Sequence, residues 1–443
     1  MNYKIRTASK EDCKEIHRMI MELALYENVA EEVKITHEDL ERDGFGQNPF
    51  FESLVAEVPE EHKSSEGHTV VGYALYFYSY STMKRHTLQM IDLYVMQEFR
   101  GSGIGKALLS KVAEVGKKKQ CMMLKTTVFK FNTPAREFYA AKGAVDLTES
   151  EGLHFLSFHG QNLDNLANED PGEEKPPMGA IHTERHHSPQ PQEAPPQRPP
   201  LNPDRPGQTP HEVQSRPSPP GPRDPQGDAP VGRPDTTPGV EGPQEETIAA
   251  PQKEKPKSRT RKLEFVAPAN MNFKIRTATK EDCKDIHRMI MDLAIYENML
   301  EQVTISVDDL ECDGFGQNPC FECLVAEVPE EHKSKEGHRL VGYTLYLGAY
   351  SSWKGRAIHL EDLYVMQEFR GIGIGKALLS KVAEMGKKKR CQRLQLTVLD
   401  WNKPSRDFYA AKGAVDLTES EGRHFLSFYR QSVDNLASEA PRD

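Results

Sequence analysis

Residues 367–376 read QEFRGIGIGK, and nearly the same ten residues, QEFRGSGIGK, stand at 97–106. The recurrence extends far beyond this stretch. Residues 1–170 and 271–440 align without a gap at a constant offset of 270, and most aligned positions are identical. A repeat of this length indicates a duplicated globular domain rather than a solenoid of short units. Each copy is long enough to bury a core of its own.

The segment between the copies has a different composition. Of the 31 prolines, 24 lie between Pro171 and Pro268, among Gln, Gly, Asp, Glu and Arg and few aromatic residues. Such a segment cannot bury enough apolar surface to offset the entropy of ordering, so we expect 171–270 to be a disordered, proline-rich linker. It serves as a tether or, through runs such as PPQRPP at 195–200, as a ligand for an aromatic groove. The basic run 253–262 is a charged linker or a nuclear address.

Charge and cysteine usage narrow the class of protein. The formal net charge of −10 argues against nucleic acid as the main partner and fits cationic ligands. Seven cysteines are an odd number for a disulfide framework, and the CxxC at 320–323 has no second pair at zinc spacing. Neither copy begins like a secretory signal, and no apolar run approaches the length of a membrane span. We therefore expect a cytoplasmic protein without a metal and without membrane contact.

The periodicity of the second copy predicts an α/β (α+β) domain. Strands are expected at 273–277, 323–328, 340–350, 357–366, 393–399 and 424–429, and helices at 281–298, 307–313, 376–388 and 403–412. The order βααβββαβαβ predicts a mixed, mostly antiparallel sheet flanked by helices, once in each copy. The charged loop 329–337 is the expected turn of a hairpin.

The glycine stretch lies at a strand–loop–helix junction. There, unpaired backbone N–H groups at the positive end of a helix dipole form a site for phosphates, and glycines allow close approach. The spacing fits neither a P-loop nor a Rossmann motif. A tight turn that merely needs glycine is the alternative.

Together with the Asn402-Lys403-Pro404-Ser405 turn and Phe408-Tyr409, this pattern resembles the GNAT superfamily of acetyl-CoA-dependent N-acetyltransferases. Both copies meet the pyrophosphate signature of that superfamily. The runs DGFG at 313–316, LVAEV at 324–328 and DWN at 400–402 narrow the resemblance to the diamine acetyltransferases, of the spermidine/spermine and thialysine types. The resemblance covers both copies, about three-quarters of the chain.

The resemblance implies an acyl-CoA acyltransferase fold and roles for individual residues. Backbone groups of the strand before the loop would hold the pantetheine arm, the loop would bind pyrophosphate, and the turn after the next strand would line the CoA channel: Leu363, Tyr364, Val365, Arg370, Gly371, Ile372, Gly373, Ile374, Gly375, Lys376, Asn402 and Ser405. The corresponding residues of the first copy are Leu93, Tyr94, Val95, Arg100, Gly101, Gly103, Gly105, Lys106 and Asn132. Tyr409, and Tyr139 in the first copy, would protonate the departing thiolate. The amine would be surrounded by Tyr296, Glu297, Glu361, Asp362, Gln395, Leu396, Thr397 and Glu421.

The chemistry leads to the same assignment independently. An alkyl amine has a reference pKa near ~10, so it arrives as a cation and must lose a proton before it attacks. Carboxylates can attract the cation and accept its proton, and Glu361 is our candidate for that base. A phenol such as Tyr409 can give a proton to a thiolate. The structural alternatives are a core aromatic pair for Phe408-Tyr409 and an exposed strand carboxylate for Glu361.

The copies differ most at 81–91 and 122–131. Glu361 becomes Ile91, Gln395 becomes Lys125 and Asp400 becomes Lys130, whereas the glycine loop is retained. Isoleucine cannot accept a proton, and lysines facing the groove would repel a cation. The sequence thus predicts that the first copy binds acetyl-CoA but is weak or altered as an amine acetyltransferase, and that the second copy, 271–440, is active.

Enzymes of this family look like homodimers, so the two copies are expected to pair as an intramolecular pseudo-dimer or between chains as a homodimer. The sequence leaves two other functions open. One is a protein lysine or N-terminal acetyltransferase, and the other is a non-catalytic acetyl-CoA-binding scaffold that presents the linker.

Overall fold

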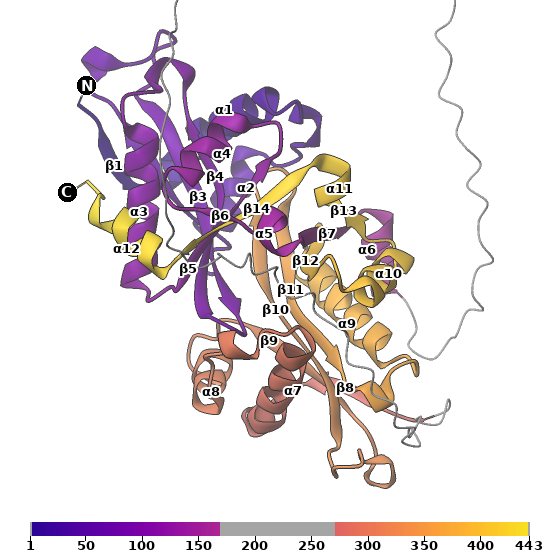
Figure 1. Ribbon diagram of the computed structural model, residues 1–443. Coiled ribbons are helices and arrows are strands. Elements are labelled where there is room, and N and C mark those ends of the chain that lie inside the picture. The colour runs from indigo at the N-terminus through magenta and orange to yellow at the C-terminus, as the bar shows by residue number, and fades with distance from the viewer. Residues whose placement is uncertain (1, 169–270, 442–443) are drawn as a thin grey trace, which may run out of the picture. The chain divides into compact units, whose positions relative to one another are not determined.

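The computed structural model describes residues 2–168 and 271–441 (Figure 1). The linker predicted at 171–270 lies entirely outside the described residues. In the described parts of the chain no helix is long and apolar enough to cross a membrane.

The two copies contain the same elements in the same order. The helices and strands of the first copy are β1 (Lys4–Thr7), α1 (Cys13–Tyr26), α2 (His37–Gly44), β2 (Glu52–Glu57), β3 (Val70–Ser81), β4 (Arg85–Val95), α3 (Ile104–Lys118), β5 (Met123–Phe129), α4 (Thr133–Ala140), β6 (Val145–Asp146), α5 (Leu147–Glu151), β7 (Leu153–His159) and α6 (Gln161–Ala167). Those of the second are β8 (Lys274–Thr277), α7 (Cys283–Tyr296), α8 (Val307–Phe315), β9 (Glu322–Glu327), β10 (Leu340–Ser351), β11 (Gly355–Val365), α9 (Ile374–Lys388), β12 (Arg393–Leu399), α10 (Lys403–Ala411), β13 (Val415–Asp416), α11 (Leu417–Glu421), β14 (Arg423–Tyr429) and α12 (Arg430–Ser438).

Most elements expected from the periodicity are confirmed. The helix expected at 281–298 is α7, preceded by a 3-10 turn at Lys280–Asp282, and the hairpin across 329–337 joins β9 to β10. The short elements β13 and α11 and the helix α12 were not predicted. They are too short, or too weakly apolar, to carry a clear period.

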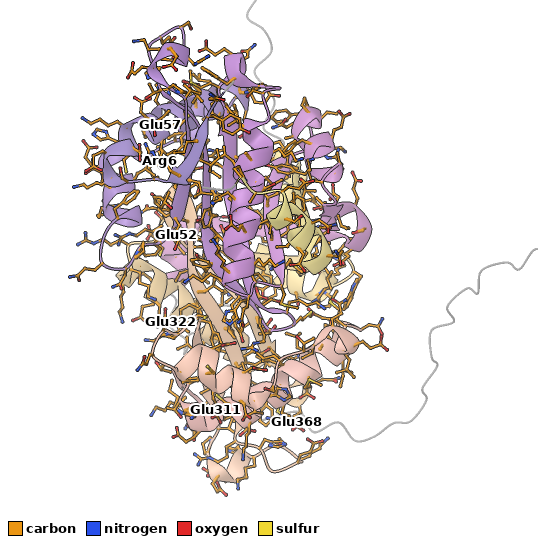
Figure 2. All side chains as sticks on the ribbon, turned by 90° about the vertical axis from the view of Figure 1, so that its left-hand side faces the viewer. Arg6, Glu52, Glu57, Glu311, Glu322 and Glu368 are labelled. Carbon is orange, nitrogen blue, oxygen red and sulfur yellow. The ribbon has the colours of Figure 1, made fainter. Side chains whose placement is uncertain are left out.

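Local signals explain where helices and outer strands lie. Helix α2 begins after Thr36, whose side chain accepts from the backbone of Asp39 while Asp39 accepts in return, which is a capping box. At the sheet edge, Arg6 of β1 forms an ion pair with Glu57 of β2 at 2.7 Å (Figure 2). The second copy repeats the pair between Arg276 and Glu327 at 2.8 Å.

The last strand of each copy belongs to the sheet of the other copy. One seven-stranded sheet has the order β1-β2-β3-β4-β5-β14-β6, and the other has the order β13-β7-β12-β11-β10-β9-β8. Strand β7 pairs antiparallel with β12 along its whole length, and β14 does the same with β5. In Figure 1 the yellow β14 accordingly runs beside the purple β5. Each sheet is mixed, with parallel pairing between β4 and β5 and between β11 and β12. The predicted fold class is confirmed, but each sheet needs both copies.

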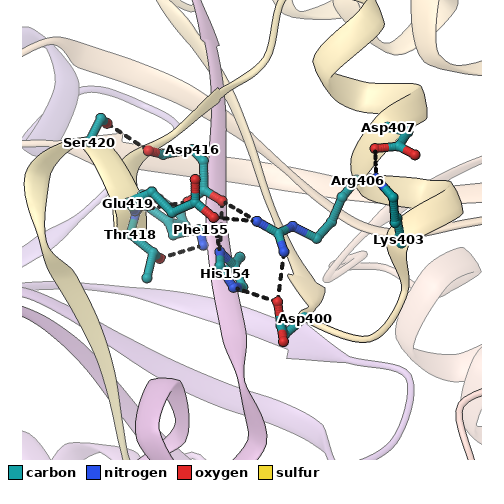
Figure 3. A network of polar contacts seen from close by, with 10 residues as sticks. All are labelled: His154, Phe155, Asp400, Lys403, Arg406, Asp407, Asp416, Thr418, Glu419 and Ser420. Atoms are coloured by element: carbon teal, nitrogen blue, oxygen red, sulfur yellow. Dashed lines mark hydrogen bonds and ion pairs between the residues drawn. The ribbon is translucent and has the colours of Figure 1, made fainter.

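Polar contacts fasten the exchanged strands. His154 of β7 contacts Asp416 at 2.7 Å and Asp400 at 3.3 Å, both in the second copy (Figure 3). Arg406 contacts Asp400 at 2.7 Å and Asp416 at 3.3 Å and so joins the same network. His424 of β14 makes the reciprocal 2.7 Å contact with Asp146 of the first copy.

Two further contacts tie the copies together away from the exchanged strands. Arg85 of the first copy lies 3.0 Å from Asp313, and Arg356 of the second lies 2.7 Å from Asp43. Asp43 and Asp313 are both buried carboxylates, so removing either arginine would take away one of the positive charges that compensate a buried negative charge. These reciprocal pairs make the interface pseudo-symmetric.

This exchange predicts how the protein assembles. The full chain should sediment as a single 50.1 kDa chain, because β7 and β14 satisfy both sheets internally. An isolated fragment 1–170 lacks β14, so it should dimerise by placing β7 of each copy in the sheet of the other. Analytical ultracentrifugation measures both masses. A stable, monomeric 1–170 fragment would contradict the exchange.

Candidate functional site

One cavity of about 590 Å³ extends from the second copy across the interface to the first. On the second-copy side it is lined by the strand β11, the glycine loop and the turn into α10. On the first-copy side it is lined by the β3–β4 turn, by β5 and by the α5–β7 junction. The site is therefore composite: one wall comes from the second copy and the other from the first.

The glycine loop has the geometry of an anion cradle. Gly371 and Gly373 adopt φ of 83° and 91°, and a Cβ added at either position would meet open space. Gly373 is the N-cap of α9, so the unpaired N–H groups of the first turn lie at the loop. This open backbone at a helix N-terminus has room for an anion, and the pyrophosphate role of the loop stays a prediction.

The loop side chains divide between cavity and core. Arg370, Gly371, Gly373, Gly375 and Lys376 line the cavity. Ile374 is a core residue and Ile372 packs against the same core, so neither side chain lines the cavity. Their predicted role in holding a cofactor could be played only by backbone N–H groups.

Arg370 orders the entrance of the cavity. Its Nε donates to the Val365 carbonyl at 2.9 Å, and its guanidinium lies 5.5 Å from the ring centroid of Tyr296 and 5.8 Å from that of Tyr364. Tyr296 in turn donates to Asn402 Oδ1 at 3.2 Å. These contacts connect residues of α7, β11 and the α10 N-cap. Leu363, Tyr364, Val365, Asn402 and Ser405 all line the cavity, as expected.

Glu361 occupies a β-bulge. In the β10–β11 ladder Leu345 pairs with Asp362 and Tyr346 with Leu360, which leaves Glu361 as the extra residue. A bulge re-aims a side chain out of the regular alternation, a device common beside active sites. The Glu361 side chain is 13% exposed, lines the cavity, and lies 3.2 Å from His359 Nε2.

Three carboxyl groups gather around this bulge, and their pKa values diverge. Burial raises the pKa of Glu361, but the positive charge of Lys125 and hydrogen bonds from His359 and Ser81 outweigh it and hold the pKa below its ordinary value. Burial, and then the charge of Glu361, raise the pKa of Asp362 to about 7. Burial, and then Asp362 and Glu361, raise the pKa of Glu297 to about 8. At neutral pH Glu361 is the member of this cluster that remains ionised.

Tyr409 is a buried residue of α10 that lines the same cavity. Burial and then the nearby Asp362 and Glu297 raise the pKa of its phenol well above the ordinary value. The hydroxyl therefore keeps its proton throughout the physiological range, which suits a proton donor.

The predicted amine-side residues are brought together only in part. Tyr296, Glu297, Asp362, Gln395 and Thr397 line the cavity, as does Glu361. Leu396 does not, because alternation along β12 turns its side chain into the core.

Glu421 does not line the cavity. Its first-copy counterpart, Glu151, lines the cavity instead. The strand exchange is the reason: the segment that precedes β7 reaches the second copy's site, and the segment that precedes β14 reaches the first copy's. Leu153, the first-copy counterpart of Arg423, likewise lines the cavity from the exchanged strand β7.

Lys125 has an effect that the sequence did not reveal. The substitution of Gln395 by lysine in the first copy predicted repulsion in the first copy's own groove. Instead, Lys125 and Glu361 line the same cavity, and the lysine's charge favours the ionised form of Glu361. Ser81 and Thr82 of the first copy hydrogen-bond to Glu361 and Asp362. Nothing in the local sequence of 81–82 or 125 pointed to the second copy.

The first copy keeps the donor-side geometry, but its donor-side residues do not line this cavity. Gly101 and Gly103 have φ of 77° and 91°, and Arg100 stacks on Tyr26 and Tyr94, each at 5.6 Å. Of the predicted first-copy residues, Leu93, Tyr94, Val95, Arg100, Gly101, Gly103, Gly105, Lys106, Asn132 and Tyr139 are all absent from the cavity lining. Tyr139 is buried, with its ring 6.2 Å from that of Phe428.

Two groups of one histidine and two acids have ligand atoms close enough for a metal ion: His154 with Asp416 and Glu419, and His424 with Asp146 and Glu149. In the first group Arg406 Nη2 contacts Asp416 at 3.3 Å and Glu419 at 2.5 Å. A guanidinium thus already supplies the positive charge there, and Arg136 does the same in the second group.

The comparisons with known proteins agree with this geometry. The acetyltransferase (GNAT) family profile matches residues 21–144 and 291–414, together more than half of the chain. The chain therefore belongs to the acetyltransferase (GNAT) family and is an acyltransferase with two tandem copies of the domain.

Within the family the chain is similar to proteins that are named for thialysine or for spermidine and spermine. It is 49% identical over 163 residues to a thialysine N-epsilon-acetyltransferase of Bos taurus, which covers 37% of this chain and 96% of the relative. It is 40% identical over 167 residues to the human spermidine/spermine N(1)-acetyltransferase-like protein 1, covering 38% of this chain and 24% of that protein. Among solved structures, a tandem GNAT protein from the clavulanic acid biosynthesis pathway covers 100% of both chains at 14% identity and a TM-score of 0.42.

The divergent carboxyl pKa values predict a specific pH profile. A cationic acceptor is attracted more strongly as Asp362 and Glu297 lose their protons, so kcat/KM should rise through a limb between pH 7 and 8. Asp362→Asn removes one titrating group and a charge that raises the pKa of Glu297, so the limb should move to lower pH. Asp308→Asn, which changes an exposed carboxylate of α8 outside the cavity, should leave the limb in place. An unmoved limb in Asp362→Asn would contradict this assignment.

Proposed function

We propose that the second copy is an acetyl-CoA-dependent N-acetyltransferase that acts on a primary amine of a small cationic acceptor. The observation that carries this proposal is one cavity in which the bulged Glu361, the buried Tyr409 and the glycine loop meet. In this account Gly371–Lys376 hold the pyrophosphate of acetyl-CoA, and Asn402 and Ser405 line its arm.

Glu361 acts as the base. It stays ionised because Lys125 and His359 favour its charge, so at neutral pH it can take a proton from the ammonium of the acceptor, directly or through water. The amine nitrogen then attacks the acetyl carbonyl, the C–S bond breaks, and the acetyl group leaves on nitrogen. Backbone N–H groups around Leu363–Val365 would stabilise the negative charge that develops on the carbonyl oxygen.

Tyr409 acts as the acid. Its phenol remains protonated, and in this role it gives a proton to the CoA thiolate as the thiolate departs. The acylated nitrogen then gives up its second proton, which restores the phenol of Tyr409 directly or through water, and Glu361 passes the proton it accepted to solvent, so that the products are an amide, the free thiol and one proton.

The acceptor class follows from the cluster of Glu297, Glu361 and Asp362, which attracts cations, and from the relatives that act on thialysine or are named for spermidine and spermine. We therefore propose a diamine, a polyamine or thialysine as the acceptor. A protein lysine or N-terminus is the alternative, which the enclosed, two-copy walls of the cavity disfavour. A non-catalytic scaffold is disfavoured by the joint presence of base and acid.

The first copy retains the glycine loop and Tyr139 but has Ile91 in place of a base, so we propose that it binds acetyl-CoA without efficient transfer. We further propose an intramolecular pseudo-dimer as the working form, supported by the exchanged strands. A cytoplasmic location is supported by the seven cysteines, all of which are free thiols.

Substitution of the base and the acid tests the mechanism. Glu361→Gln should lower kcat about 10²- to 10⁴-fold, and Tyr409→Phe should lower it by about 10² or more, in the range of general acid–base catalysis. Steady-state assays with acetyl-CoA and spermidine, spermine or thialysine measure this.

The matched controls are Glu384→Gln on the outer surface of α9 and Tyr78→Phe on β3, which should keep wild-type rates. Wild-type turnover in Glu361→Gln would remove Glu361 from the role of base. Turnover of a histone peptide above that of all three small amines would favour the protein-lysine alternative.

A further inference from the structure

The first copy has its own counterpart of the acceptor site, but side chains of the second copy occupy it. The counterparts of Glu297 and Asp362 are Glu27 and Asp92, and both are conserved in type. Beside them lie Trp353, from the β10–β11 turn, and Arg423, from the exchanged strand β14. At both sites the neighbouring side chains come from the other copy, but at the first site they are an aromatic ring and a guanidinium.

Arg423 is held by an aromatic clamp. In the β14–β5 ladder Arg423 stands opposite Phe129, and its guanidinium lies 4.6 Å from the ring centroid of Phe129 and 4.7 Å from that of Trp353. The two rings are stacked, with centroids 5.9 Å apart and planes 12° apart, and Phe131 stacks on Phe129 at 5.1 Å. The Arg423 side chain is 12% exposed and Trp353 is 7% exposed, so both are largely buried. The Nε atom of Arg423 also lies 2.6 Å from the Glu421 carboxylate.

The charge of Arg423 acts on the carboxyls of this site. Burial raises the pKa of Asp92, and Arg423 opposes the rise together with hydrogen bonds from Ser352 and Tyr73. Burial, then Asp92, raise the pKa of Glu27 to about 7, again against the charge of Arg423. A fixed guanidinium thus contributes here the electrostatic interaction that a cationic acceptor would contribute.

The matched positions at the second site leave room. Met83 stands where Trp353 does, Leu153 where Arg423 does, and Leu399 where Phe129 does, and all three line the cavity. The cavity reaches Asp92, Trp353 and Arg423 and includes neither Tyr139 nor the first glycine loop. Trp353 and Arg423 consequently stand between the open cavity and the donor elements of the first copy.

We propose that Arg423 and Trp353 close the acceptor site of the first copy, with the guanidinium in the position of a cationic acceptor, so that the full chain offers one acceptor site. This differs from the loss of a base at Ile91, because it excludes binding as well as transfer. It goes beyond the proposed function and does not require that the second copy acetylate the ligand used as a probe.

Exchange of matched residues between the copies tests the closure. Arg423→Leu with Trp353→Met gives the first site the residues of the open one, and Leu153→Arg with Met83→Trp gives the open site the residues of the closed one. Spermidine, and separately thialysine, is titrated calorimetrically into each full-length protein in the presence of CoA. We expect one binding site in the wild type, two after opening the first site, and none after closing the second.

The difference between variant and wild type decides the result. An unchanged number of sites after Arg423→Leu/Trp353→Met, or two equal sites in the wild type, would overturn the closure. If this variant unfolds at a markedly lower temperature, the single substitution Arg423→Leu, which removes the guanidinium and leaves Trp353 in place, tests the same expectation of a gained site. If Arg423→Leu/Trp353→Met gains a binding site but neither the wild type nor any variant acetylates spermidine or thialysine, the proposed function is refuted and the closure stands.

Discussion

The antiparallel pairing of β7 with β12, and of β14 with β5, is the constraint on which the rest of this structure depends. Each of these strands pairs over seven residues with a strand of the other copy, and histidine contacts such as His154–Asp416 hold its start. Without this pairing each sheet would end at β5 or β12 with an unpaired row of N–H and C=O groups. The pairing makes the two copies one folding unit.

The exchange also decides which site is affected when a residue differs between the copies. Because the end of each copy lies at the other copy's site, a substitution in one half changes the chemistry of the other half. Lys125 in the first copy sets the charge state of Glu361, and Arg423 in the second fills the site beside Asp92. Duplication followed by divergence has thus produced two unequal sites from two nearly equal sequences. One site is open and acidic, and the other is closed around a guanidinium.

Much of each copy could be predicted from its sequence, because the elements have clear periods and the glycine loop has one physical reading. Glu361 and Tyr409 could be selected because the chemistry needs a base and an acid and few residues of the right type follow the motifs. The exchange could not be predicted. Strands β7 and β14 share the letters HFLSF, so pairing with either sheet satisfies the same backbone and side-chain requirements. For that reason Glu421 rather than Glu151 was placed at the second site. Ile372, Ile374 and Leu396 were assigned to the site for a different reason: each belongs to a run of residues that was assigned as a whole, and its own side chain faces the core.

Cysteine cross-linking across the β7–β12 ladder tests the exchange most directly. Ser157 stands opposite Gln395, whereas Ser427, its counterpart in the second copy, stands opposite Lys125. Opposed residues of antiparallel strands lie within disulfide reach. In dilute oxidised protein, Ser157→Cys with Gln395→Cys should link within one chain, and Ser427→Cys with Gln395→Cys should not, as read by non-reducing gels and peptide mass mapping. A link in the second variant, or a link between two chains in the first, would contradict the account.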